Sequence, residues 1–314
     1  MNSDQIKIGI THGDINGIGY EVIIKSLIDS RINDICIPIV YGSPKVAAYH
    51  RKALNIDNFS FNNITKVEEA HRKRPNIINC VDENVRVELG KSSSMAGEAS
   101  RLALEAGVKD LKEGKIQALV TAPINKHNIQ SEKFNFSGHT EYLQSVYGSG
   151  EVLMLMVSDL LKIGVVAGHI PVCRLSEYIT TERILNKLRV INRSLKQDFG
   201  IRKPKIAVLG LNPHAGDNGL LGKEENETII PALERAKSEN MIVSGPYPAD
   251  GFFGSGGFKP FDGVLAMYHD QGLIPFKTLV SDEGVNYTAG LPVVRTSPAH
   301  GTAFEIAGKN EANP

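Results

Sequence analysis

Short apolar runs alternate along the chain with longer segments whose apolar residues recur at a helical period. The short runs predict strands at residues 6–11, 35–41, 118–121, 152–157, 163–167, 206–209 and 264–267. The longer segments predict amphipathic helices at residues 99–111, 184–195 and 224–237. Most of the strand segments lack polar alternation, which is typical of sheets that helices cover on both faces. The pattern therefore predicts an α/β protein with a mostly parallel sheet.

The length of 314 residues corresponds to about two domains. No Pro-, Gly- or Ser-rich stretch is long enough to be a flexible linker, so we expect the two domains to be closely joined. The segment 251–257 is rich in glycine but also contains two phenylalanines. These aromatic residues favour an ordered loop or a mobile lid over a spacer.

Composition narrows the range of partners and compartments. The chain has 35 Lys plus Arg and 35 Asp plus Glu, so it lacks the basic excess that nucleic acids and anionic membranes attract. No apolar run approaches the roughly 18 residues of a membrane helix, and no secretory leader is recognisable. The three cysteines form no CxxC pair. We expect a cytoplasmic protein with neither nucleic-acid nor membrane partners.

A glycine-rich segment, residues 13–19, follows the first predicted strand and precedes a helix, where backbone N–H groups can bind an anion. Its spacing is not GxGxxG, and a tight turn that uses glycine for its backbone freedom explains it as well. No Rossmann or Walker A fingerprint occurs elsewhere, so a dinucleotide requires another scaffold.

Four histidines stand in turn-like segments at or near strand ends: His139, His169, His214 and His269. Three imidazoles can hold one divalent ion and leave coordination positions for a substrate. Spacing alone does not show that they converge, and a hydrogen-bonded loop histidine is the commoner case. Lys277, Asn286 and Arg295 also lie in loop-like sequence. Arg295 can make a two-pronged contact with a carboxylate or phosphate, although solvated arginines are far more frequent.

Segments spread over nearly the whole chain together resemble the 4-hydroxythreonine-4-phosphate dehydrogenase family of vitamin B6 biosynthesis. They are residues 11–14 with 17–19, 121–126, 136–141, 211–216, 245–246 with 248–250, 266–272 and 284–286. The segment 300–314 resembles the adenosine-side loop of isocitrate and isopropylmalate dehydrogenases. Two departures from the commoner family pattern lie in the first loop, where His12 replaces Pro and Ile15-Asn16 replaces Pro-Ala.

The resemblance implies two α/β/α domains with an active-site cleft between them, residues 1–125 plus 288–314 on the cofactor side and 126–287 on the metal and dimer side. It implies a homodimer with a shared active site, NAD or NADP bound without a Rossmann fingerprint, and one divalent ion (Zn, Mg or Co). The matching positions assign the metal ligands to His169, His214 and His269. Substrate contacts fall on His139, Thr140, Lys277, Asn286 and Arg295.

Further roles follow from the same resemblance. Asp250 and Asp270 are candidates for proton transfer or for orienting a histidine. The cofactor loop contains His300, Gly301 and Gly308. In the same loop Lys309 would favour the 2′-phosphate of NADP and Glu311 the free ribose diol of NAD, and we expect a slight preference for NAD.

The implied reaction oxidises 4-phosphooxy-L-threonine at C3 and then releases CO2 to give 3-amino-2-oxopropyl phosphate. Related dehydrogenases of another four-carbon phosphorylated acid, such as erythronate 4-phosphate, or of a cis-dihydrodiol are alternatives within the family. A non-redox alternative is an acyltransferase or phosphate-binding protein of the wider superfamily. The native metal, the preferred dinucleotide and the general base stay open.

Overall fold

The computed structural model describes residues 5–82, 84–280 and 283–314, which fall into two compact units. Unit 1 is Met1–Val146 with Val293–Pro314, and unit 2 is Tyr147–Pro292. Residues 126–146, which we expected in the second domain, therefore belong to unit 1, and residues 288–292, which we expected in the first, belong to unit 2. The backbone of Asn128 fills the space beside Gly97, and its Nδ2 donates to Asp14 at 2.8 Å. These contacts fix the segment on the unit 1 core.

The sheet of unit 1 is parallel, with the strand order β3-β4-β2-β1-β5-β12. Its strands are β1 (Lys7–Thr11), β2 (Ile37–Gly42), β3 (Asn62–Ile64), β4 (Asn76–Asn79), β5 (Ala118–Thr121) and β12 (Val294–Pro298). Its helices are α1 (Gly19–Ile28), α2 (Ile32–Ile35), α3 (Pro44–Ala53), α4 (Ser94–Lys112) and α5 (His139–Tyr147), with short 3₁₀ turns at Val67–Glu69 and Phe304–Ile306.

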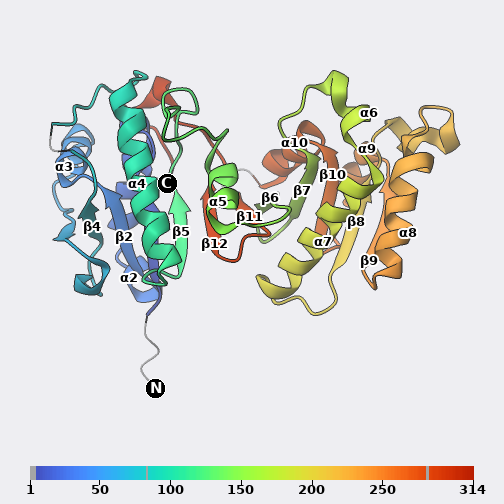
Figure 1. The fold of residues 1–314 in the computed structure, drawn as a ribbon, viewed down its shortest axis with the longest axis horizontal. Coiled ribbons are helices and arrows are strands. Elements are labelled where there is room, and N and C mark those ends of the chain that lie inside the picture. The colour runs from blue at the N-terminus through green and yellow to red at the C-terminus, as the bar shows by residue number, and fades with distance from the viewer. Residues whose placement is uncertain (1–4, 83, 281–282) are drawn as a thin grey trace. The chain divides into compact units, whose positions relative to one another are not determined.

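Helix α4 lies across strands β1, β2 and β5 (Figure 1). Ser93 caps its first turn by accepting a hydrogen bond from the Ala96 N–H, and Ser43 caps α3 in the same way. The buried residues of α1, α3 and α4 join those of β2 and β4 in one apolar core. Strand β2 is buried at every position, as its continuous apolar sequence predicts.

The sheet of unit 2 has the order β11-β6-β7-β10-β8-β9, in which β6 runs antiparallel to both β11 and β7. Its strands are β6 (Leu153–Val157), β7 (Lys162–Ala167), β8 (Lys205–Leu209), β9 (Ile242–Tyr247), β10 (Gly263–Tyr268) and β11 (Val285–Ala289). Its helices are α6 (Leu175–Tyr178), α7 (Thr181–Gln197), α8 (Ile230–Ser238), α9 (Ala249–Gly254) and α10 (His269–Val280). Short segments with 3₁₀ or π geometry occupy Val172–Arg174, Pro213–Gly219 and Glu225–Ile229.

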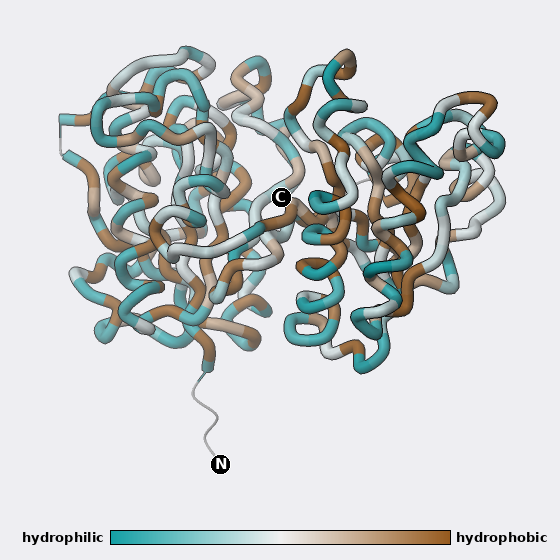
Figure 2. The backbone as a smooth tube through the Cα atoms, turned by 45° about the vertical axis from the view of Figure 1, so that its right-hand side comes forward, coloured by the Kyte–Doolittle hydropathy of each residue, from teal (hydrophilic) through white to brown (hydrophobic). Residues whose placement is uncertain are grey.

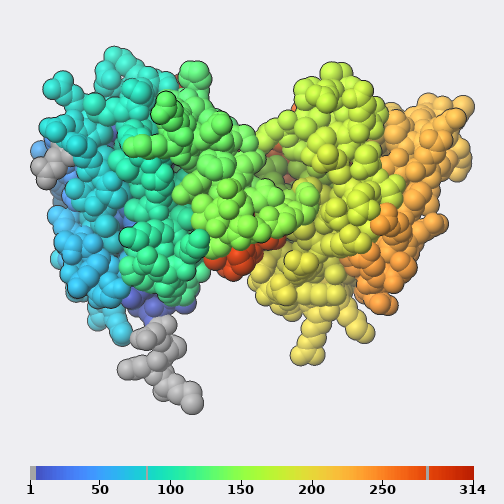
Figure 3. Space-filling view, in the orientation of Figure 1, coloured from blue at the N-terminus to red at the C-terminus, as the bar shows by residue number. Residues whose placement is uncertain are grey.

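Helices cover both faces of the unit 2 sheet. Ile191 and Leu195 of α7 contact Gly263 of β10, whereas Gly272 of α10 contacts Ala266 on the same strand. Residues 263 and 266 point to opposite faces because side chains alternate along a strand. Hydrophobic and hydrophilic segments alternate along the backbone of each unit (Figure 2). Helices α7 (yellow) and α8 (orange) contribute to the face of unit 2 seen in Figure 3.

The predicted α/β class and all seven predicted strands are confirmed. The predicted helix at 224–237 starts instead with a π-helical turn, Glu225–Ile229. The proposed loop or lid at 251–257 begins within helix α9, where Phe252 is buried and stacks on Tyr247 at a centroid distance of 5.2 Å. Nowhere in the described part of the chain is a helix both long and apolar enough to span a bilayer.

Candidate active site

The three predicted metal ligands follow neighbouring parallel strands of unit 2. His169 comes two residues after β7, His214 lies in the segment after β8, and His269 is the first residue of α10, directly after β10. Because β7, β10 and β8 are parallel neighbours, these segments leave the same edge of the sheet. This explains why histidines up to 100 residues apart in sequence lie in one region of unit 2.

Two of the three imidazoles are adjacent. The ring centroids of His169 and His269 are 6.0 Å apart. His269 donates from Nδ1 to Oδ1 of Asp270 at 2.7 Å, which leaves Nε2 available as a ligand. This bond favours the orienting role of Asp270 over proton transfer.

The third imidazole is carried by an unusual backbone. His214, Ala215, Gly216, Asp217 and Asn218 all have positive φ, at 54°, 51°, 79°, 43° and 56°. Each non-glycine residue in the left-handed region costs about 1–2 kcal/mol, so surrounding contacts must hold this segment in place.

No set of three or more His, Cys, Asp or Glu within the described ranges is arranged to hold a metal ion. The structure thus brings His169 and His269 together and places His214 outside a single three-ligand group. The donors themselves, imidazoles of which one is held by a carboxylate, suit a divalent transition-metal ion.

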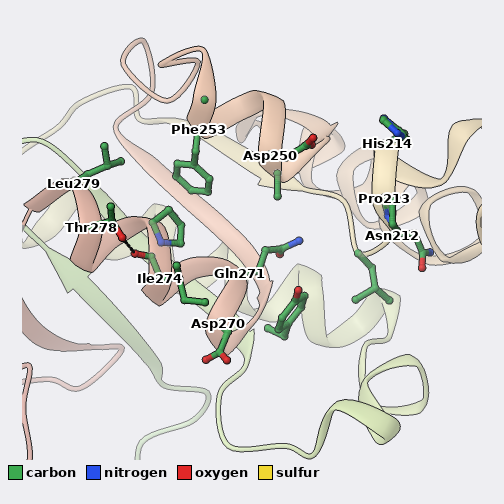
Figure 4. Close-up of a pocket in the computed structure, with 15 residues that line it drawn as sticks. Asn212, Pro213, His214, Asp250, Phe253, Asp270, Gln271, Ile274, Thr278 and Leu279 are labelled. Atoms are coloured by element: carbon green, nitrogen blue, oxygen red, sulfur yellow. Dashed lines mark hydrogen bonds between the residues drawn. The ribbon is translucent and has the colours of Figure 1, made fainter.

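A pocket of about 690 Å³ opens in unit 2 among the segments after β8 and β9 and helix α10. Phe253, Ile274 and Leu279 give it an apolar side, while Asp250 and Asp270 supply carboxylates. Figure 4 shows Asp250 and His214 on one side of the pocket and Asp270 on another, near Gln271. The pocket is therefore bordered by both predicted catalytic carboxylates and by one predicted metal ligand.

The other predicted substrate residues of unit 2 differ in their surroundings. Lys277 is exposed on α10. Asn286 lies on β11, where its Oδ1 is buried without a hydrogen-bond partner among the described residues. A buried amide oxygen without a partner is uncommon and is expected where a ligand supplies the missing donor.

A second group of predicted residues is built within unit 1. Arg295 on β12 is only 3% exposed and donates from Nε and Nη2 to Oγ1 of Thr121, at 3.1 and 2.6 Å. Burial lowers the pKa of Arg295 to about 10, and the nearby Glu141 opposes that shift. The guanidinium is therefore a fixed, poorly solvated cation on β12, beside β5.

His139 begins α5 beside this cation. Burial lowers the pKa of His139 well below its usual value, and the positive charges of Arg295 and Lys126 lower that pKa further. Its Nε2 is buried and has no hydrogen-bond partner in the described ranges. Thr140 follows in the first turn of the same helix. The group offers a neutral imidazole, a hydroxyl and a guanidinium to an anionic ligand.

The predicted cofactor loop is anchored to the first loop of unit 1. Thr302 accepts a hydrogen bond from the Ile18 N–H at 3.1 Å. Gly308 has φ +76°, and Leu89 occupies the space where its Cβ would stand, so local packing explains this glycine. Gly301 has open space around it, and His300 beside it is exposed. Room for a ligand therefore lies at the start of this loop.

The end of the loop is held by α1. Lys25 donates from Nζ to the carbonyl oxygens of Asn310 and Ala312, at 3.1 and 2.7 Å. The buried Glu21 accepts from the Ala312 N–H at 3.0 Å.

Several residues that support these groups were not singled out from the sequence. Thr121 and Gln271 lie inside segments that carry the family resemblance, which is the signal that indicates them. Glu225 is a buried carboxylate that accepts hydrogen bonds from residues 211 and 212. Glu225 follows Glu224 at the start of a predicted helix, where acidic residues are common because they complement the helix dipole. The sequence therefore gives no separate signal for Glu225.

An α/β fold with titratable side chains after the carboxyl ends of parallel strands is the architecture of an α/β enzyme. The chain belongs to the family described as pyridoxal phosphate biosynthetic protein PdxA, which it matches over residues 34–314. The resemblance found in the sequence is thereby confirmed.

Relatives with assigned names match over the full length. A 4-hydroxythreonine-4-phosphate dehydrogenase of Bacteroides thetaiotaomicron is 56% identical, with 100% of this chain and 86% of the relative covered. A D-threonate 4-phosphate dehydrogenase of Cupriavidus necator is 41% identical over 98% of this chain and 93% of the relative. These names support the predicted dehydrogenase class.

Solved structures agree in fold. The crystal structure of 4-hydroxythreonine-4-phosphate dehydrogenase from Klebsiella pneumoniae has a TM-score of 0.86 and 34% identity, covering 100% of this chain and 95% of that one. A terephthalate 1,2-cis-dihydrodiol dehydrogenase from Burkholderia xenovorans has a TM-score of 0.64 at 23% identity, covering 98% of this chain and 94% of that one. The latter likeness concerns the fold alone.

Proposed function

We propose that this protein is a 4-hydroxythreonine-4-phosphate dehydrogenase. It oxidises the C3 hydroxyl of 4-phosphooxy-L-threonine by transferring a hydride to NAD or NADP and releasing the hydroxyl proton. The resulting β-keto acid then loses CO2 to give 3-amino-2-oxopropyl phosphate. The observation that supports the proposal is the 56% identity, over the whole of this chain and 86% of the relative, to a protein of that name.

The chain's own residues supply binding and orientation in this proposal. Arg295, with Thr121 fixing its guanidinium, and Lys277 bind the anionic groups of the substrate. The neutral His139, together with Thr140 and Asn286, orients the substrate through uncharged hydrogen bonds.

His169, His214 and His269 would hold one divalent ion, which polarises the reacting oxygen when bound. Asp270 keeps the His269 ring oriented through the bond to Nδ1. Asp250, which lines the pocket together with His214, would receive or return a proton at the substrate.

The partner in the proposed assembly is a second copy of the chain that shares the active site. The apolar side of the 690 Å³ pocket supports this, because Ile274 and Leu279 on α10 are 61% and 41% exposed. Light scattering at micromolar concentration tests for the dimer. The protein is proposed to act in the cytoplasm, without nucleic-acid or membrane partners.

A second substrate is favoured by one specific observation, the 41% identity to a D-threonate 4-phosphate dehydrogenase. The two substrates differ at C2, where one carries an amine and the other a hydroxyl. Steady-state assays with 4-phosphooxy-L-threonine, D-threonate 4-phosphate and erythronate 4-phosphate, each with NAD and NADP, separate the candidates. A kcat/KM higher for either acid lacking the amine overturns the proposed substrate. Absence of reduced dinucleotide with all three overturns the dehydrogenase reaction.

Arg295→Lys is expected to lower kcat/KM about 10²-fold, because a charged two-pronged contact contributes about 1.5–3 kcal/mol. A lysine keeps a positive charge but lacks the planar donor pair. Steady-state kinetics measure the effect, and Arg31→Lys, at an exposed ion pair with Asp29, is the matched control. Unchanged kinetics in both Arg295→Lys and Arg295→Ala would remove Arg295 from the site.

Gly301→Val is expected to weaken dinucleotide binding about tenfold, because a branched side chain there fills the open space at the start of the cofactor loop. Lys309→Glu is expected to weaken NADP more than NAD through repulsion of the 2′-phosphate. Fluorescence titration with both dinucleotides measures the affinities, with the exposed Lys112→Glu on α4 as a charge control. Affinities unaltered in both loop variants place the cofactor elsewhere.

A further inference from the structure

Glu225 is a buried carboxylate in unit 2, only 2% exposed, that forms no ion pair in the described part of the chain. Its Oε1 accepts hydrogen bonds from the backbone N–H groups of Leu211 and Asn212, at 2.8 and 2.7 Å. Its Oε2 accepts from Asn212 Nδ2 at 2.9 Å. All three donors belong to the segment that leads from β8 into the left-handed run at His214.

The carboxylate also lies inside the turn that this segment makes. A Cβ on Gly216 would stand 2.5 Å from Oε2 of Glu225, and one on Gly210 would stand 3.2 Å from Oε1. Glycine at these positions lets the backbone close around the carboxylate. Glu225 therefore contacts the chain both before and within the run of positive φ.

The wide turn that begins at Glu225 contributes to this arrangement. Residues Glu225–Ile229 form a π-helix, a geometry found frequently at functional sites. The preceding Glu224 also reaches the same amide, since its Oε2 accepts from Asn212 Nδ2 at 2.8 Å. Adjacent carboxylates thus converge on Asn212, and Glu225 is the one that accepts from the backbone N–H groups of Leu211 and Asn212.

We propose that Glu225 is a positioning residue that fixes the His214 segment relative to His269. A second side chain, Gln271, connects the segment after β8 to β10. It donates from Nε2 to the Gly210 carbonyl at 2.6 Å and accepts from the Met267 N–H at 2.7 Å. Met267 lies on β10, two residues before His269. The inference that Glu225 affects metal affinity rests on the proposed function. The inference that Glu225 holds the backbone of residues 211 and 212 does not.

Glu225→Gln tests the proposal in the full-length protein. The amide oxygen can still accept from the two backbone N–H groups, but the new NH2 faces Asn212 Nδ2, where a donor meets a donor. Co²⁺ affinity, followed by visible absorption and calorimetry without substrate, is expected to fall about 10–100-fold. Hydrogen exchange at the amides of Leu211 and Asn212 is expected to accelerate at least about tenfold.

Two matched controls separate positioning from charge and from general instability. Glu224→Gln removes the neighbouring charge and leaves the backbone contacts, so Co²⁺ affinity should stay within about twofold. Leu233→Ala, in the buried face of α8, destabilises the same region without touching the loop. Its thermal midpoint serves as the reference for any instability in Glu225→Gln.

The proposal stands if Glu225→Gln alone weakens Co²⁺ binding and accelerates exchange at residues 211 and 212. It is overturned if Glu224→Gln has an equal effect, if Leu233→Ala at equal loss of thermal stability weakens Co²⁺ binding equally, or if exchange is unchanged. If the unmodified protein binds no Co²⁺, the metal assignment of the proposed function fails. Exchange at residues 211 and 212 then decides the role of Glu225 by itself.

Discussion

The triple variant His169→Ala, His214→Ala and His269→Ala is expected to bind no Zn²⁺, Mg²⁺ or Co²⁺ at the active site and to lose at least about 10³-fold in kcat/KM. Polarisation of a reacting oxygen by a divalent ion contributes several kcal/mol to the transition state, and each 1.36 kcal/mol corresponds to about tenfold. The three side chains follow neighbouring parallel strands, and two of the rings have centroids 6.0 Å apart.

Equilibrium dialysis with metal analysis gives the stoichiometry, and steady-state kinetics give the loss of activity. His71→Ala, at an exposed histidine of unit 1, is the control for removing an imidazole far from the strand-end loops. A triple variant that folds normally and retains full metal stoichiometry would show that the ion binds elsewhere. Loss of metal together with full activity would show that the ion is not needed for the reaction.

The fold was predictable where local sequence dominates. The run 264–267 is apolar throughout and lies within β10, and the run 118–121 matches β5. Strand β3 was not predicted, because Asn62 and Asn63 are polar. Its pairing with β4 supplies the stabilisation that its sequence does not indicate. The antiparallel direction of β6 likewise depends on its partners and not on its own composition.

The site was predictable as a set of residues but not as a geometry. Arg295 meets Thr121, 174 positions away in the chain, because β12 is inserted beside β5. No spacing rule indicates such a contact, and the resemblance to a family was needed to select Arg295. The left-handed run at His214 was equally hidden, because Ala215 and Asp217 are not residues that demand positive φ. We attribute their conformation to the way Glu225 holds the adjoining residues Leu211 and Asn212.

His12 is the departure from the family pattern whose physical consequence is largest. Its ring is fully buried and stacks on Tyr20 at a centroid distance of 5.2 Å, and Tyr20 stacks in turn on the buried His50 at 5.2 Å. His50 contacts the Ile15 carbonyl through Nε2 at 2.8 Å. Burial lowers the pKa of both His12 and His50 to about 4. The folded protein therefore keeps both rings neutral at a pH where an exposed histidine is already charged.

Stability is accordingly expected to fall as the pH drops from about 6.5 to about 4. In this window the unfolded chain binds a proton on each of these histidines and the folded protein does not, so acid favours unfolding. Each histidine contributes a slope of up to about 1.4 kcal/mol per pH unit, or roughly 3 kcal/mol over the window. Above pH 6.5 the contribution is fully present, and below pH 4 the slope from these two groups vanishes.

His12→Leu tests this directly, because leucine fills the buried space with a side chain that cannot be protonated. The free energy of unfolding, measured by urea denaturation at half-unit steps between pH 4 and 7, should depend on pH less steeply by about one proton, or about 1.4 kcal/mol per pH unit. Any constant loss from imperfect packing shifts the whole curve without altering its slope. His71→Leu, at an exposed position, should leave the slope unchanged. Equal slopes for the unmodified protein and His12→Leu would mean that His12 is protonated in the folded state as readily as in the unfolded chain.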